Sequence, residues 1–262
     1  MEVRSARGGR IRAGSQAWRH PDRRTSEGRG LILLGSLLIL GATSAACDRA
    51  AYYLLQGQYG AAIRQLDGAR TSGGSNAENE NLRGLALMMA GDTRSALAAF
   101  DSALKMQPSL TESKFNRGVA LLRSGDATRA AAEFAAIARD EKSPLRASAA
   151  YHHALALDRL GRTADAESWL DRALALDPTL DAALLYAGAL RERRGAVDAA
   201  AKNYLAYLKR HPDSIAAMLR LGVAAHRAGR TDVAIPYLRK VIDKAPRSPE
   251  AVEARKFLVM WE

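Results

Sequence analysis

Residues 84–108 read GLALMMAGDTRSALAAFDSALKMQP, and residues 118–144 read GVALLRSGDATRAAAEFAAIARDEKSP. The second stretch repeats the layout of the first. In each, a second glycine follows the first by seven residues and leads into aspartate, an alanine-rich run with one phenylalanine, and a proline. Self-similarity at a fixed period indicates a protein built from stacked repeats.

Three residue types recur in this register along the chain. The second glycine recurs at Gly57, Gly91, Gly125, Gly161, Gly195 and Gly229, and the interval is constant except between Gly125 and Gly161, where it is two residues longer. An alanine follows each by five residues, at Ala62, Ala96, Ala130, Ala166, Ala200 and Ala234. A proline ends most units, at Pro108, Pro144, Pro178, Pro212 and Pro246. Glycine permits the left-handed turn that ends a helix and proline cannot continue one, so each unit is predicted to be an antiparallel helix pair.

The two helices of each unit are predicted to pack closely. Small residues stand about two turns before the turn glycine, at Gly84, Gly118, Ala154, Gly188 and Gly222. A larger side chain there would push the helices apart. Residues after the turn are expected to cap the second helix, namely Asp92, Asp126, Thr163 and Thr231. Since one unit cannot bury its apolar face alone, the units are expected to stack.

This pattern resembles the tetratricopeptide repeat family. The residues that carry the resemblance are Gly84, Gly91, Ala96, Phe100, Ala103 and Pro108, and then Gly118, Gly125, Ala130, Phe134 and Pro144. The resemblance covers residues 47–262 and implies an all-α fold, a right-handed superhelical solenoid of antiparallel helix pairs with about six repeats. It also implies that the chain binds proteins or peptides.

The register divides the chain into a degenerate first unit (47–76), five full units (77–248) and a C-terminal capping helix (249–262). Two extra residues enter the third unit, and we expect them in its second helix or in the loop that follows. The capping helix is expected to cover the open end of the stack. If its end, Val259-Met260-Trp261, overhangs instead, it would allow self-association.

The N-terminal segment, residues 1–46, is predicted to be a lipoprotein-type signal peptide. An arginine-rich start precedes the apolar run 31–40, the small residues 41–46 and Cys47, the single cysteine. The uncharged stretch 31–46 is shorter than the roughly 20 residues needed to span a bilayer. Ser44-Ala45-Ala46-Cys47 resembles the lipobox at which bacterial lipoproteins are acylated and cut, although Ser44 replaces the usual leucine. The alternative for Cys47 is a buried helical cysteine.

These features predict a lipid anchor at Cys47 on the periplasmic side of a bacterial membrane. Asp48 matches a signal that retains lipoproteins at the inner membrane in enteric bacteria, so it favours that membrane.

The resemblance implies a concave groove lined by first-helix side chains. They are Asn81, Leu85, Met88, Phe115, Val119, Tyr151, Leu155, Leu185, Ala189, Leu219 and Val223. This mostly apolar trough suits a partner helix or an extended peptide. The alternative is that many of these residues only seal neighbouring helices together.

An arginine recurs two residues before the turn glycine in four units, at Arg123, Arg159, Arg193 and Arg227. Cations in the last turn of a helix interact favourably with the helix dipole, which alone explains such a row. The alternative is a basic ladder at the groove edge that attracts an acidic partner segment.

No set of nucleophile, base and orienting group, and no metal-ligand spacing, stands out, so neither an enzyme nor a cofactor is predicted. His152 and His153 are adjacent and point to different helix faces, and His226 lies two repeats away. Of the net charge of +11, +5 lies in the first thirty residues and +6 on residues 47–262. Without an aromatic-interleaved basic run, this does not predict nucleic-acid binding.

The predicted function is a membrane-tethered scaffold or adaptor lipoprotein that assists assembly or stability of a cell-envelope complex. The alternative is a non-lipidated adaptor of the same fold, either membrane-anchored or cytoplasmic.

Overall fold

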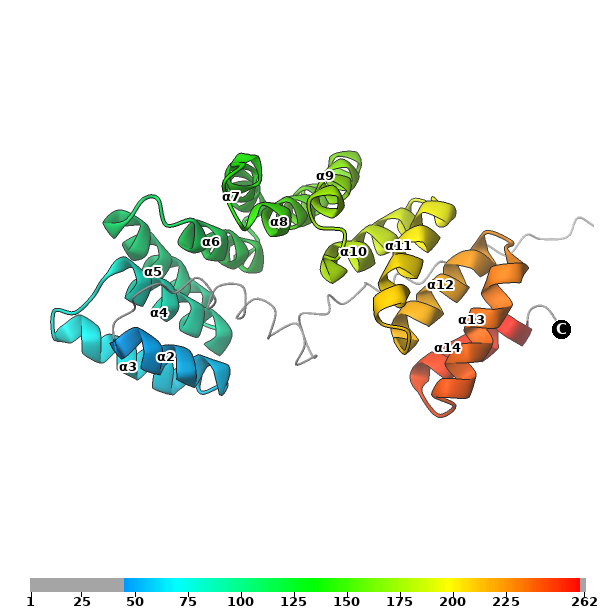
Figure 1. The fold of residues 1–262 in the computed structure, drawn as a ribbon, viewed down its shortest axis with the longest axis horizontal. Coiled ribbons are helices and arrows are strands. Elements are labelled where there is room, and N and C mark those ends of the chain that lie inside the picture. Colours follow the sequence, from blue (N-terminus) through cyan, green and yellow to red (C-terminus); the bar gives the residue numbers. More distant parts are fainter. Residues whose placement is uncertain (1–44, 260–262) are drawn as a thin grey trace, which may run out of the picture. The chain divides into compact units, whose positions relative to one another are not determined.

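The structure is a computed structural model that describes residues 45–259. Most of the predicted signal segment and the residues Met260 and Trp261 therefore lie outside the described residues. Within the described range the chain forms thirteen α-helices and no strand, as predicted for an all-α repeat protein (Figure 1).

Twelve helices form six consecutive antiparallel pairs. The pairs are α2 (Ala45–Leu55) with α3 (Tyr59–Thr71), α4 (Ala77–Ala90) with α5 (Thr93–Met106), α6 (Thr111–Ser124) with α7 (Ala127–Arg139), α8 (Arg146–Arg159) with α9 (Thr163–Leu176), α10 (Asp181–Arg193) with α11 (Val197–Arg210), and α12 (Ile215–Arg227) with α13 (Thr231–Lys244). The last helix is α14 (Pro249–Leu258). Each pair packs against the next along the chain, which confirms the predicted solenoid (Figure 1).

The turn inside each pair is made by the predicted glycine. All six turn glycines have positive φ, between 70° at Gly57 and Gly229 and 95° at Gly91. Asp92 then accepts a hydrogen bond from the backbone N–H of Ser95 at 3.0 Å, and Asp126 caps α7 in the same way. Both caps confirm the prediction.

The predicted threonine caps are wrong. Thr163 and Thr231 are the first residues of α9 and α13, and the cap positions are Arg162 and Arg230, which make no side-chain capping hydrogen bond. The reason is one of spacing. In these two units arginine directly follows the turn glycine, where Asp92 and Asp126 stand in other units, so the threonine comes one residue too late to cap.

The prolines follow the second helices as predicted. The helices α5, α9, α11 and α13 each end two residues before a proline. In the third unit α7 already ends at Arg139, five residues before Pro144. The two extra residues of this unit therefore lengthen the loop 140–145 and leave the helix at 13 residues.

Close packing inside the units follows from the small residues of the first helices. A Cβ atom added at Gly118 would lie 2.8 Å from the ring of Phe134, and one at Gly188 would lie 2.6 Å from that of Tyr204. Gly84 lies equally close to Phe100, and Gly222 to Leu238. In all four pairs the two residues are 16 positions apart in the sequence. A Cβ at these positions would overlap its neighbour, so glycine there sets how closely the two helices approach.

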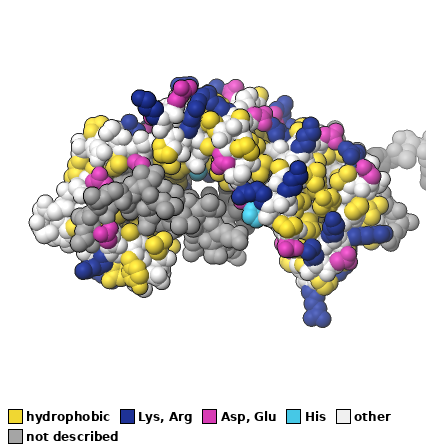
Figure 2. All heavy atoms as spheres, viewed as in Figure 1, with side chains coloured by type: hydrophobic (Ala, Val, Ile, Leu, Met, Phe, Trp, Pro, Cys, Tyr) yellow, Lys and Arg dark blue, Asp and Glu magenta, His cyan; other side chains and the backbone are white. Residues whose placement is uncertain are grey.

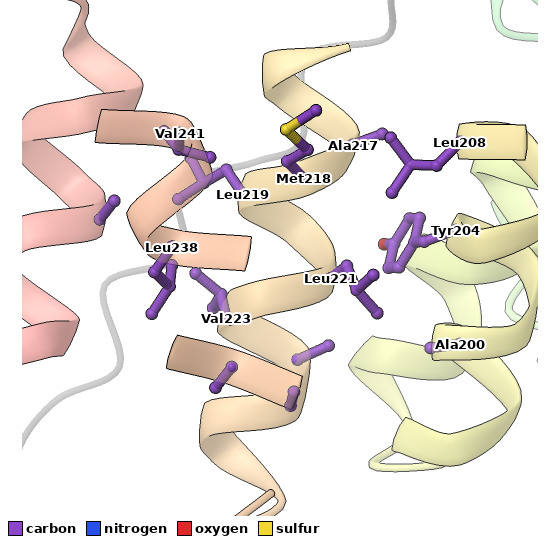
Figure 3. Close-up of a cluster of buried hydrophobic side chains, with 14 of the residues drawn as sticks. Ala200, Tyr204, Leu208, Ala217, Met218, Leu219, Leu221, Val223, Leu238 and Val241 are labelled. Atoms are coloured by element: carbon purple, nitrogen blue, oxygen red, sulfur yellow. The ribbon is translucent and has the colours of Figure 1, made fainter. Parts of the chain in front are cut away.

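Each first helix is buried between the second helices of its own and the preceding unit. Figure 2 shows charged side chains of both signs scattered among apolar and other side chains on the visible surface, whereas Figure 3 shows the apolar interior around α12. Tyr204 and Leu208 of α11 meet α12 on one side, and Leu238 and Val241 of α13 meet it on the other. All four side chains are at most 7% exposed.

The last helix, α14, packs on α12 and α13 through its buried residues Ala251 and Ala254. Its other face leaves Val252 50% exposed, and Val259 just beyond its end is 67% exposed. Self-association through this end of the chain stays a prediction.

The glycine contact gives a stability prediction. Gly118→Ala should lower the free energy of unfolding by about 1–3 kcal/mol, because the new methyl group overlaps the Phe134 ring. Gly68→Ala in α3 is the matched control, since nothing lies within 4 Å of its Cβ position, and it should stabilise by up to about 1 kcal/mol through helix propensity. Urea unfolding followed by circular dichroism measures both.

The double variant Gly118→Ala/Phe134→Leu should recover part of the loss, because the fourth unit already carries Ala154 and Leu170 at this spacing. Equal effects of the two alanine substitutions would contradict the role assigned to the contact.

Candidate protein-binding groove

The predicted groove residues lie on the first helices α4, α6, α8, α10 and α12, as their register requires. Nine of the eleven are at most 9% exposed, and only Leu185 and Ala189 of α10 are partly exposed. Most of these side chains thus pack within the array, the second of the two roles considered from the sequence. Their direct contact with a partner stays a prediction, with α10 as its most accessible part.

A buried amide pair joins the first helices of the second and third units. The side-chain amide of Asn116 donates to Oδ1 of Asn81 at 3.1 Å, and both residues are at most 9% exposed. Asn116 was not among the predicted site residues. Because buried polar groups are costly unless paired, this contact favours one alignment of α4 against α6.

Aromatic rings continue along the middle of the array. Phe115 of α6 contacts His152 of α8 with ring centroids 4.9 Å apart, and Tyr151 of α8 contacts Tyr186 of α10 at 6.2 Å. His153 points elsewhere, as predicted for adjacent helical residues. It packs on Trp169 at 4.6 Å, and its Nδ1 lies 2.9 Å from the carbonyl oxygen of Ala131.

The four arginines of the recurring row each bind the preceding unit. Arg123 donates to the carbonyl oxygen of Met88 at 3.2 Å, and Arg159 donates to that of Leu122 at 2.5 Å. Both acceptors lie in the last turn of the preceding first helix, where the dipole is negative. The favourable dipole contact predicted for these arginines therefore also involves the neighbouring helix.

In the fifth and sixth units the arginine donates to a carboxylate instead of a backbone carbonyl. Arg193 donates to Asp158 and Arg227 to Glu192, each at 2.6 Å. Glu192 also accepts a hydrogen bond from the hydroxyl of Tyr204 at 3.0 Å, and Asp158 accepts one from Tyr186. Sequence reasoning missed these two acids. The signal in the sequence that could have found them is an acidic residue 35 positions before the arginine, which is one repeat plus one residue.

Burial and the neighbouring carboxylate hold both tyrosines in the neutral form. Burial, the hydrogen bond to Asp158 and its charge raise the pKa of Tyr186 well above the usual range. Burial and the adjacent Glu192 do the same to the pKa of Tyr204. Each hydroxyl thus remains a donor at physiological pH, which is what its carboxylate partner requires.

Cys47 lies in the first turn of α2 and is buried. Its thiol donates to Oδ1 of Asn79 in α4 at 2.7 Å. In this arrangement the thiol contributes to packing between the first two units, so attachment of a lipid requires this contact to open.

Membrane-spanning and metal-binding features are both missing from residues 45–259. No helix in that range combines the length and the apolar character that crossing a bilayer requires. The same residues contain no cluster of three or more His, Cys, Asp or Glu side chains placed to hold a metal ion.

The Glu192 contacts give a second prediction. Glu192→Ala should lower the free energy of unfolding by about 1–3 kcal/mol, because the Tyr204 hydroxyl and the Arg227 guanidinium both lose a buried acceptor. Arg227→Ala should cost less than about 1 kcal/mol, since that side chain is 56% exposed. A double-mutant cycle by urea unfolding checks this, and strictly additive effects would contradict the contact.

His153 gives a prediction on pH. Burial lowers its pKa below the ordinary value near 6.5, so the unfolded chain takes up this proton first. The stability that His153 contributes is therefore full above about pH 6.5 and is lost as the pH falls through the folded-state pKa. The melting temperature of His153→Gln should depend less on pH between about 7.5 and 5 than that of the wild type. Parallel curves would contradict the assignment.

Solved structures share the fold over most of the chain. The crystal structure of PilW, a widely conserved type IV pilus biogenesis factor, matches 80% of this chain and 97% of its own with a TM-score of 0.71 and 21% identity. PilF of Pseudomonas aeruginosa matches 87% of this chain and 99% of its own, with a TM-score of 0.69 and 17% identity. YrrB, a repeat protein with an unusual peptide-binding site, matches 73% of this chain and 97% of its own, with a TM-score of 0.57 and 21% identity.

Identities this low establish the fold and leave the partner open. No curated protein matches the sequence significantly. The profile of the tetratricopeptide repeat family matches residues 47–110, 81–143, 115–181 and 185–249, which together are most of the chain. Neither the family nor the similar structures indicate a catalytic activity. The chain belongs to the tetratricopeptide repeat family.

Proposed function

We propose that this protein is a scaffold that is tethered to a bacterial membrane through a lipid on Cys47 and holds a partner protein in a cell-envelope complex. Its repeats supply the protein-binding body, and the segment before them supplies the export signal. The tether places the scaffold on the periplasmic side of the membrane, with Asp48 favouring the inner one.

The observation that carries the proposal is the coincidence of two boundaries. The basic, apolar and small segments of the sequence end at Cys47, and the first described helix of the repeat body, α2, begins at Ala45. Cleavage before Cys47 would remove the signal and leave all but the first two residues of α2. The lipid would then sit at the very start of the repeat array.

Acylation has a local structural cost in this proposal. The Cys47 thiol would have to leave Asn79, and the first turn of α2 would have to open. The rest of α2 retains its own anchors, because Ala50 is fully buried and Leu54 is 1% exposed. A lipid anchor and a folded first unit are therefore compatible.

The pilus machinery is the envelope complex that the comparisons favour. The likeness spans 97% of PilW, a type IV pilus biogenesis factor, and 99% of PilF, so the whole array is shared and not one repeat. The shared fold is what supports the pilus machinery as the class of complex in this proposal. Because the identities are only 21% and 17%, the partner itself is left to experiment.

The buried Cys47 favours one second candidate. A thiol that is fully buried and bonded to Asn79 is the arrangement expected of a structural cysteine in a non-lipidated adaptor. In that case the chain keeps its N-terminal segment and acts either as an anchored or as a cytoplasmic adaptor of the same fold.

The intact mass of the protein extracted from bacterial membranes separates these two candidates. We expect a species that begins at Cys47 and carries added acyl mass, and we expect Cys47→Ser to abolish both processing and acylation. Circular dichroism of Cys47→Ser serves as the control for folding. An unacylated, full-length wild-type chain would overturn the lipoprotein proposal and favour the second candidate.

A further inference from the structure

The net positive charge of the repeat body lies in its C-terminal third, residues 181–259. Residues 45–180 hold 16 Lys and Arg and 16 Asp and Glu, so this part is neutral. Residues 181–259 hold 15 Lys and Arg and 8 Asp and Glu, a net charge of +7. A surface that carries this surplus attracts acidic partners over a distance of about one Debye length.

A cleft of about 450 Å³ lies in this region, mainly between the second helices α11 and α13. Val197, Ala201 and Leu205 line it from α11, and Val233 lines it from α13. Leu205 is 37% exposed, although it is a large apolar side chain. Ala225 of α12 completes the lining. The floor of the cleft is thus apolar and accessible, and it contains none of the predicted groove residues.

One lysine lines this floor, and two more lie two helical turns further along α11 and α13. Lys202 lines the cleft, and Lys209 follows it seven residues later on the same face of α11. On α13, Lys240 lies seven residues after Val233 and rests over the ring of Tyr237 at 4.9 Å. Among residues 45–259 no carboxylate forms an ion pair with Lys202, Lys209 or Lys240.

The acidic side chains at the cleft are already engaged. Asp198 lies 2.9 Å from Arg230, and Asp232 lies 3.3 Å from the same guanidinium. The two carboxylates outweigh Arg230 by one negative charge, so with Lys202, Lys209 and Lys240 the group keeps a net charge of +2. On the part of the molecule that carries α11 to α13, Figure 2 shows apolar and basic side chains intermixed, with some acidic ones among them.

We propose that the cleft between α11 and α13 binds an acidic amphipathic helix of a partner protein. Apolar side chains on one face of that helix would enter the cleft between Leu205 and Val233, and its carboxylates would pair with Lys202, Lys209 and Lys240. This site is separate from the first-helix groove and does not depend on the lipid tether, so either can fail alone.

A pair of model peptides tests the proposal. Each is a fluorescein-labelled helix of about 18 residues, roughly five turns, with leucine at i, i+4 and i+7 positions and either glutamate or lysine elsewhere. Fluorescence anisotropy with the full chain in mild detergent is the measurement, and titration of detergent alone is the blank. We expect the glutamate peptide to bind with a dissociation constant on the order of tens of micromolar. It should weaken at high salt, and the lysine peptide should not bind.

Two variants and a matched control locate the site. Leu205→Glu should weaken binding at least about tenfold, because it places a charge on the cleft floor. Leu176→Glu in α9 is the control, since Leu176 is also 37% exposed, and it should bind as the wild type does. Lys202→Glu/Lys209→Glu should lose the glutamate peptide and gain the lysine peptide, which a merely misfolded variant would not do.

Other outcomes overturn the inference. They are failure of the glutamate peptide to bind the wild type, equal binding of both peptides, and equal affinities of Leu205→Glu and Leu176→Glu. If a change at Leu185 abolished binding and changes at the cleft did not, the peptide would be assigned to the first-helix groove instead.

Discussion

The contact on which the array depends is that between a glycine of the first helix, present in four of the six units, and a large side chain at a fixed position in the second helix. Gly84, Gly118 and Gly188 receive the rings of Phe100, Phe134 and Tyr204 where a Cβ atom would overlap them. This contact sets the distance between the two helices of a pair. Because each first helix is also buried against the preceding unit, an error in that distance would pass to the next interface.

Tyr204 connects this packing to the polar contacts between units. Its ring fills the space over Gly188, and its hydroxyl donates to Glu192, which accepts Arg227 of the next unit. Earlier units use backbone carbonyls as acceptors for the corresponding arginines. The arginine row thus joins neighbouring units whatever residue its acceptor is. Its charges are largely engaged within the protein, which weakens the view of the row as a free basic ladder.

The sequence was sufficient to predict the repeat fold, because turn glycines, close-packing glycines and prolines act within a single unit. It failed where the outcome depends on a single position or on the neighbouring unit. The cap prediction missed that Arg162 and Arg230 occupy the capping position. The groove prediction could not show that Leu85 and Leu155 would be buried between helices, and the acceptors Asp158 and Glu192 belong to contacts between one unit and the next. Helical periodicity marks apolar faces and does not show which of them a neighbour covers.

Taken together, the two proposals give the middle units of the array a role. The tether is proposed at α2 in the first unit, and the acidic helix is proposed to bind at α11 and α13 in the fifth and sixth. Contacts in a repeat array run only between neighbours, so the three intervening units must carry the mechanical connection between these ends. The buried pair Asn81 and Asn116, the aromatic contacts of α6, α8 and α10, and the arginine row lie along this part of the chain. Loosening them would separate membrane attachment from partner binding without altering either site.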